Sequence, residues 1–120
     1  MISIETIDSC TIFRVTGDVT ANEIIVEATR YLAGKQTDTS LWDFSLAGSV
    51  KISTVEMKGI AESLKLFQTD GQSRKVALVG SKTINIGLGK LFAAFAQIAE
   101  LPHTYKVFRN FDDAMHWLGG

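Results

Sequence analysis

The chain has 120 residues, of which 46% are hydrophobic and 21% are charged, and its formal net charge is −1. A chain of this length and composition can bury its own hydrophobic core, so we expect a single domain over residues 1–120. Acidic and basic residues are mixed along the chain. No Lys/Arg cluster supplies the basic patch that non-specific nucleic-acid binding needs, so we expect no nucleic-acid partner.

The cysteine count and the apolar runs exclude further classes of protein. Cys10 is the only cysteine, which rules out an intramolecular disulfide and a metal site built from several thiolates. No uninterrupted apolar run reaches the roughly 18 residues of a transmembrane segment. The first residues alternate apolar and polar and lack the basic start and apolar run of a signal peptide. We therefore expect a cytoplasmic protein.

The N-terminal third of the chain predicts a β-hairpin followed by a helix. Residues 2–7 and 10–16 are the expected strands, with a turn at Asp8 and Ser9 and an end at Gly17-Asp18. Thr20 and Glu23 have the spacing of a capping box, which marks the start of a helix. Gly34 is expected to end that helix in the left-handed conformation.

The middle of the chain predicts a short strand, a loop, a second helix and a central strand. The third strand is expected over residues 41–44, and residues 46–51 are expected to form a loop. Ser53 and Glu56 repeat the capping-box spacing at the start of the second helix. Residues 69–72 are expected to end that helix, and the apolar run 76–79 indicates a strand covered on both faces.

The C-terminal third of the chain predicts a helix, a strand and a final helix. The third helix is expected within residues 86–100, and Pro102 separates it from a strand at residues 105–108. Asn110 is expected to cap a helix over residues 111–118. The order β-β-α-β-α-β-α-β-α predicts an α/β domain with a mixed, mostly parallel five-stranded sheet and four helices.

Two places offer polar candidate residues, each with a structural alternative. Asp43 lies near the end of the third strand, where acidic side chains often reach the functional edge of an α/β sheet, or it caps the loop that follows. Ser53 and Thr54 stand at a helix N-terminus, where a phosphate would be stabilised, or Ser53 serves only as the N-cap.

The apolar segment 84–99 offers the other candidate site. Lys90 is its only charged residue, and a helix that is apolar on all sides must be buried or must contact another apolar surface. Leu88, Leu91, Phe92 and Phe95, together with Ile98, are expected to form its contact face. A subunit interface as in a homodimer, an apolar ligand pocket and contact with a membrane surface would each explain the segment.

Known catalytic and cofactor motifs do not occur. Gly87, Gly89 and Lys90 fit neither the phosphate-binding loop nor the dinucleotide-binding pattern. His103 and His116 have no carboxylate or thiol at the spacing of a zinc site. We therefore expect no metal, no cofactor and no enzymatic activity, although Asp43, Ser53 and Thr54 would be the residues to consider if the protein were an enzyme.

The whole chain resembles the SpoIIAA-like family of STAS domains. The likeness rests on the strand pieces 41–45 and 75–79, and on the strand 105–109 running into the acidic helix 112–118 that ends in Trp-Leu. The resemblance implies a regulatory or ligand-binding module. In the anti-anti-sigma branch a serine in an Asp-Ser-Ser-Gly-like motif is phosphorylated; residues 52–55 keep the hydroxyls but lack the aspartate and glycine.

Two functional hypotheses follow. The first is a non-enzymatic module that binds an apolar or lipid-like ligand, or a protein partner, through the third helix. The alternative is a protein-interaction domain that resembles anti-sigma-factor antagonists and is switched by phosphorylation at Ser53 or Thr54.

Overall fold

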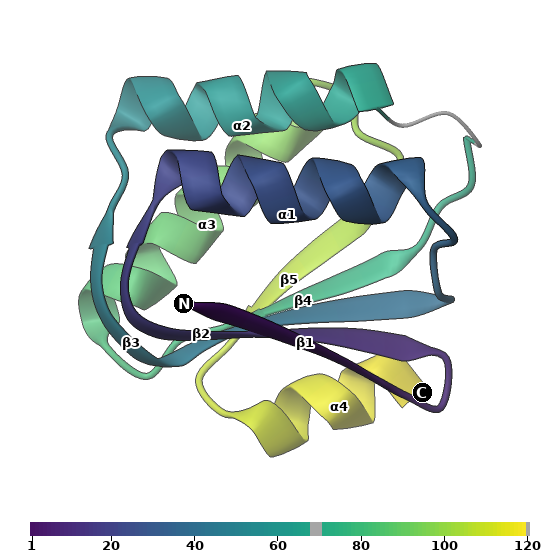
Figure 1. Ribbon diagram of the computed structural model, residues 1–120, viewed down its shortest axis with the longest axis horizontal. Coiled ribbons are helices and arrows are strands. Elements are labelled where there is room, and N and C mark those ends of the chain that lie inside the picture. The colour runs from purple at the N-terminus through teal and green to yellow at the C-terminus, as the bar shows by residue number, and fades with distance from the viewer. Residues whose placement is uncertain (68–70, 120) are drawn as a thin grey trace.

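The computed structural model describes residues 1–67 and 71–119, which form one sheet and its helices (Figure 1). The elements, in chain order, are β1 (Ile2–Ile7), β2 (Cys10–Thr20), α1 (Ala21–Ala33), β3 (Thr39–Lys51), α2 (Thr54–Phe67), β4 (Lys75–Val79), α3 (Thr83–Ile98), β5 (Thr104–Phe108) and α4 (Phe111–Gly119). The predicted order of elements is confirmed. The expected stop at residues 69–72 falls partly on residues 69 and 70, which lie outside the described residues.

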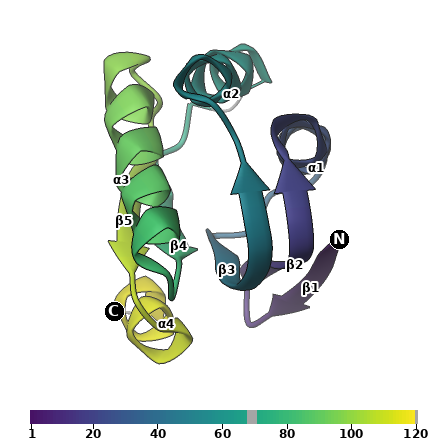
Figure 2. The same cartoon turned by 90° about the vertical axis from the view of Figure 1, so that its left-hand side faces the viewer.

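The strands lie in the sheet in the order in which they occur in the chain. β1 pairs antiparallel with β2, and β2, β3, β4 and β5 are all parallel. Each crossover through α1, α2 or α3 therefore moves the chain one strand further in the same direction. Because such crossovers are right-handed, the three helices must lie on one face of the sheet. Figures 1 and 2 show this arrangement, with α4 alone on the opposite face.

The sheet thus separates two apolar cores. The larger core lies under α1, α2 and α3 and contains Phe13, Trp42 and Leu78 from the strands. The smaller core lies under α4 and contains Ile12, Leu41 and other alternate strand residues. Successive side chains of a strand point to opposite faces, which explains why Ile12 and Phe13 enter different cores.

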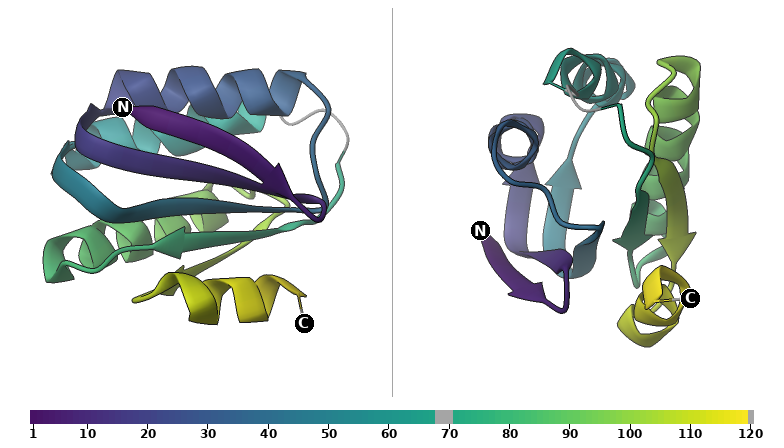
Figure 3. Two further views of the ribbon diagram at one scale, coloured as in Figure 1. Left: turned by 60° about the horizontal axis from the view of Figure 1, so that its bottom comes forward. Right: turned by 90° about the vertical axis from the view of Figure 1, so that its right-hand side faces the viewer.

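The N-terminal hairpin forms as predicted. Ile7 pairs with Cys10, which leaves Asp8 and Ser9 as a two-residue turn. Both have positive φ values, 47° and 64°, as a type I′ turn requires because its twist matches that of the strands. β1 forms an outer edge of the sheet (Figure 3).

The predicted end of β2 and the predicted loop at residues 46–51 are wrong. β2 continues to Thr20 and β3 to Lys51, and the two extensions pair with each other through register shifts on either side of Gly17. Asp18 Oδ1 accepts a hydrogen bond from Ser49 N at 2.8 Å. A side chain at position 48 would place its Cβ 2.8 Å from that same carboxylate oxygen, so a larger residue than Gly48 would displace the Asp18 carboxylate.

These extensions curve away from the flat part of the sheet toward the starts of α1 and α2 (Figure 1). Glycine and aspartate at these positions are turn signals in the sequence. Here they form bulges instead, because pairing with a strand distant in sequence satisfies the backbone.

Both capping boxes mark the observed helix starts. Glu23 N donates to Thr20 Oγ1 at 3.4 Å. At α2 the box is reciprocal, since Glu56 N donates to Ser53 Oγ at 3.1 Å and Ser53 N donates to Glu56 Oε1 at 2.9 Å. Gly34 follows α1 as expected, but its φ of −97° shows that it does not adopt the left-handed conformation.

The third helix begins earlier than predicted. It starts at Thr83, so Gly87 and Gly89 lie well within it. A Cβ at position 89 would lie 3.2 Å from Val107 Cγ2, which shows that Gly89 permits close packing of α3 on β5. Ile98, which was expected on the contact face, is 74% exposed. Because α3 is apolar nearly all round, its periodicity does not decide which of its residues face the sheet.

The helix α4 depends on its cap and on contacts with basic side chains. Asp113 N donates to Asn110 Oδ1 at 2.8 Å, which confirms Asn110 as the N-cap. Lys75 Nζ donates to Trp117 O at 3.1 Å and lies 5.2 Å from the centre of the Trp117 ring. Ala114 and Leu118 are buried, with Phe111, Met115 and Trp117 packed around them, as expected.

We predict that Asn110→Ala lowers the free energy of unfolding by about 1 kcal/mol, because it removes the cap of a short helix. Urea denaturation followed by circular dichroism measures the change. Asn110→Ser is the matched control, since serine can accept the same bond and should restore most of the loss. Equal stability of Asn110→Ala and the parent protein would show that the cap contributes nothing.

Candidate ligand-binding cavity

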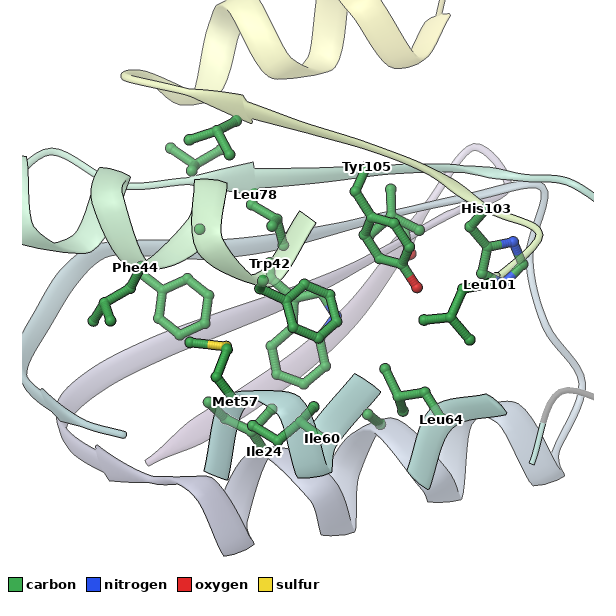
Figure 4. Close-up of a pocket in the computed structure, with 18 of the residues that line it drawn as sticks. Ile24, Trp42, Phe44, Met57, Ile60, Leu64, Leu78, Leu101, His103 and Tyr105 are labelled. Carbon is green, nitrogen blue, oxygen red and sulfur yellow. The ribbon is translucent and has the colours of Figure 1, made fainter. Parts of the chain in front are cut away.

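An apolar cavity lies between the sheet and its three covering helices (Figure 4). Its volume is about 110 Å³. The side chains that line it are mostly apolar, and they include Ile24, Trp42, Phe44, Val50, Ile52, Met57, Ile60, Leu64, Val76, Leu78, Leu88, Phe92, Leu101, Tyr105 and Val107. Residues from α1, α2, α3 and three strands thus meet at one place.

Alternate residues of the central strands form the floor of the cavity. Trp42 and Phe44 are two residues apart on β3 and therefore point to the same face. The Trp42 ring stacks on the Phe13 ring, with centroids 4.2 Å apart and an interplanar angle of 7°. The Phe44 ring lies 6.3 Å from the Trp42 ring at 16°. These contacts hold the indole of Trp42 at the base of the cavity.

One face of α2 and one face of α3 form the walls of the cavity. Met57, Ile60 and Leu64 recur at the spacing of one face of α2 and line the cavity. On α3 the stripe runs through Leu88 to Phe92. The Phe92 ring packs edge-on against Tyr105 of β5, with centroids 5.2 Å apart.

A group of polar side chains lies at one end of the cavity. Arg74 N donates to His103 Nδ1 at 3.1 Å, and Arg74 NH1 donates to Gln36 Oε1 at 3.1 Å. The rings of His103 and Tyr105 have centroids 6.2 Å apart, and Figure 4 shows both side chains at this end. Burial raises the pKa of Tyr105 above its ordinary value, so its hydroxyl remains a neutral hydrogen-bond donor at physiological pH.

The opposite end of the cavity lies at the start of α3, beside Gly80 and Asn85. Asn85 is 8% exposed. Its Nδ2 atom is buried and has no hydrogen-bond partner among the described residues.

The structure brings together two of the apolar candidate residues and separates the rest. Leu88 and Phe92 line the cavity. Leu91 and Phe95 are half-buried elsewhere on α3 and are not part of its lining. Asp43 points to the other face of the sheet, because its neighbours Trp42 and Phe44 face the cavity.

Asp43 has a structural role in the position where it lies. It is 8% exposed, and its Oδ1 accepts a hydrogen bond from Ser45 N at 2.9 Å. This is the bond expected of an aspartate that stabilises the chain just after it. Ser53 and Thr54 are exposed at the start of α2, and Asp43 does not join them in one cleft.

Several cavity residues were not predicted from the sequence. Trp42, Phe44 and Met57 were assigned only to their elements, and Asn85 was not considered. A signal for Asn85 existed, because it precedes Leu88 by three residues and Phe92 by seven, which places all three on one helix face. The contribution of Tyr105 depends on the pairing of β5 with β4, which no local pattern shows.

The described part of the chain lacks the features of two other classes of site. Residues 1–67 and 71–119 contain no group of three or more His, Cys, Asp or Glu side chains that could hold a metal ion. None of the helices in these residues has the length and apolarity to span a bilayer. Cys10 is buried, and this burial raises the pKa of its thiol.

The strand order, the three helices on one face of the sheet and α4 on the other give the chain an α/β fold with one mixed sheet. The structure is similar to that of the anti-sigma factor antagonist SpoIIAA in its unphosphorylated form, with a TM-score of 0.60 and 12% identity over 100% of this chain and 97% of that chain. It is also similar to the Bacillus cell fate determinant SpoIIAA in the phosphorylated form, with a TM-score of 0.56 and 11% identity over 98% of each chain.

The chain therefore has the SpoIIAA-like fold that the sequence resemblance implied. At this identity the likeness establishes the fold alone. No protein family matches the sequence. No curated protein matches it either.

We predict that stability falls at alkaline pH through Tyr105. Its pKa is raised in the folded protein, so the folded state holds the proton more tightly than the unfolded chain. The stabilisation is complete below the unfolded pKa of about 10 and is lost above it, by about 1.4 kcal/mol per pH unit.

Urea unfolding of the parent protein and of Tyr105→Phe, from about pH 8 to about pH 11, measures this effect. Other groups titrate in both proteins, so only the difference between the two curves reports Tyr105. The free energies of unfolding should diverge above about pH 10. Parallel curves over the whole range would refute the role of Tyr105.

Proposed function

We propose that this chain is a non-enzymatic binding module of the STAS type whose cavity takes an apolar small molecule. The observation that carries the proposal is the apolar cavity beneath three helices, lined by Trp42, Phe44, Leu88 and Phe92. Leu88 and Phe92 belong to the apolar segment 84–99 that stands out in the sequence.

The size of the cavity favours a ligand over empty space. An unfilled cavity reduces stability by about 24 cal/mol per Å³. A cavity of about 110 Å³ therefore corresponds to about 2–3 kcal/mol that a filled core would retain. Larger side chains on α2 or α3 would remove that loss.

The size also limits what the ligand is. An engineered cavity of roughly 150 Å³ with a similar lining binds benzene. The space of about 110 Å³ thus suits a small ring or the end of an alkyl chain. Each buried methylene contributes about 0.8 kcal/mol, so four of them contribute about 3 kcal/mol to binding.

We predict that 1-bromohexane quenches the fluorescence of Trp42 in a saturable manner. Bromine quenches an indole only in near contact, and Trp42 lines the cavity while Trp117 packs on the opposite face of the sheet. Trp117→Phe leaves Trp42 as the only tryptophan, and Trp42→Phe leaves Trp117. The first variant should show saturable quenching, and the second only a weak effect linear in concentration.

A pair of substitutions on one helix distinguishes cavity binding from adsorption. Leu88→Phe adds volume inside the cavity, and Leu91→Phe adds the same volume on α3 outside it. In the Trp117→Phe background we expect Leu88→Phe to lower the affinity at least tenfold and Leu91→Phe to leave it unchanged. Equal quenching of Trp42 and Trp117, or equal effects of the two leucine variants, would contradict the proposal.

A second candidate function is a protein-interaction domain switched by phosphorylation of Ser53. Ser53 is exposed at the N-terminus of α2, where the helix dipole and free amides stabilise a phosphate. Large apolar side chains lie exposed at the same edge of the sheet, with Leu46, Val55 and Ile84 exposed by 72%, 81% and 69%. Such side chains suit a protein partner that the added charge would repel or reorient.

We predict that extract of the source organism with ATP phosphorylates the chain at Ser53. Phosphopeptide mapping locates the modification. Ser53→Ala should abolish it, while the neighbouring Thr54→Ala should preserve it. Phosphate found only at other residues would exclude this switch.

A further inference from the structure

The stripe of α3 that faces the cavity begins with an amide and continues with apolar side chains. Asn85, Leu88, Gly89 and Phe92 all line the cavity and follow the i, i+3, i+4, i+7 spacing of one helix face. Asn85 is the polar member, and it stands in the first turn of the helix.

The amide of Asn85 is buried without an acceptor. Its Nδ2 has no partner among the described residues, and the residue is only 8% exposed. A buried donor in such a setting reduces stability unless something accepts its hydrogen bond. A Cβ on Gly80 would lie 3.2 Å from Asn85 Cβ, so the start of α3 is packed tightly against the end of β4.

The end of the helix that carries Asn85 also favours a negative charge. The N-cap residue of α3 is Lys82, whose side chain makes no cap hydrogen bond, and the first turn contains no acidic residue. The first amides of a 16-residue helix carry a partial positive charge. The Lys82 ammonium lies at this end, where it donates to Ala47 O and Gly48 O at 3.3 and 3.2 Å.

We propose that the ligand is an alkyl carboxylate whose head group accepts a hydrogen bond from Asn85 at the start of α3. This inference rests on the proposed function, because it names the class of molecule that the cavity takes. The alkyl chain lies along Leu88 and Phe92 toward Trp42. The carboxylate then supplies the acceptor that Asn85 lacks and the charge that the helix end favours.

Binding of hexanoate and hexylammonium, measured by isothermal titration calorimetry, tests the inference. The two probes share a six-carbon chain, but hexanoate accepts hydrogen bonds and hexylammonium can only donate them. The parent protein should bind hexanoate at least about tenfold more tightly than hexylammonium, the size of effect that one satisfied buried donor gives.

Substitutions of Asn85 locate that preference. Asn85→Leu keeps the volume but removes the donor, so we expect a tenfold or greater loss of hexanoate affinity with little change for hexylammonium. Asn85→Asp should reverse the preference. Asn22→Leu, which changes an exposed amide on α1 outside the cavity, is the matched control and should leave both affinities unchanged.

The outcomes separate the two proposals. If neither probe binds the parent protein, the proposed apolar-ligand function fails. If both probes bind equally, or if Asn85→Leu keeps the preference for hexanoate, the cavity binds apolar molecules but the inference about Asn85 is overturned. Loss of the preference in Arg74→Gln with retention in Asn85→Leu would place the head group at the other end of the cavity and would also overturn it.

Discussion

The handedness of the three parallel crossovers is the constraint on which the rest of this structure depends. The strands follow one another in sequence order, so every right-handed connection places its helix on the same face of the sheet. Three helices must then share a face of only five strands. The side chains of these helices and of the sheet leave a space of about 110 Å³ unfilled between them. The cavity is a consequence of topology as much as of residue choice.

The order of the helices and strands could be predicted from the sequence, but the cavity between them could not. Helix starts were predictable because a capping box is a local pattern, and both Thr20 and Ser53 cap as expected. The extensions of β2 and β3 were missed because Gly17 and Gly48 are turn signals locally, whereas a distant strand decides their conformation. Local chemistry sets the ends of elements, and long-range pairing can override them.

The residues of the candidate site were harder to predict from the sequence than the elements were. Leu88 and Phe92 were found because they are large and apolar, but their partners Leu91 and Phe95 were chosen from a helix whose periodicity is weak on every side. Asn85 was missed because a lone amide has no meaning until its surroundings are known. Asn85 points to a ligand because its Nδ2 is buried without an acceptor. This burial is known only once the fold is known.

The two proposed activities occupy different parts of one scaffold. The phosphorylation candidate lies at the N-terminus of α2, and Ile52 and Met57 on either side of it line the cavity. A ligand that moves α2 would therefore also move the residues around Ser53. The start of α2 thus lies between the internal cavity and the exposed hydroxyl of Ser53.

The position of α4 has a consequence for how the chain folds. This helix alone covers the second core, and it follows every strand in the sequence. During synthesis the first three helices can close their face while Ile12, Leu41 and Val79 remain open to solvent on the other. Until α4 docks, the growing chain presents a flat apolar surface, the state in which partly folded proteins aggregate. Asn110 caps the start of α4 and Lys75 contacts its end, so these two polar side chains hold in place the helix that covers this apolar surface.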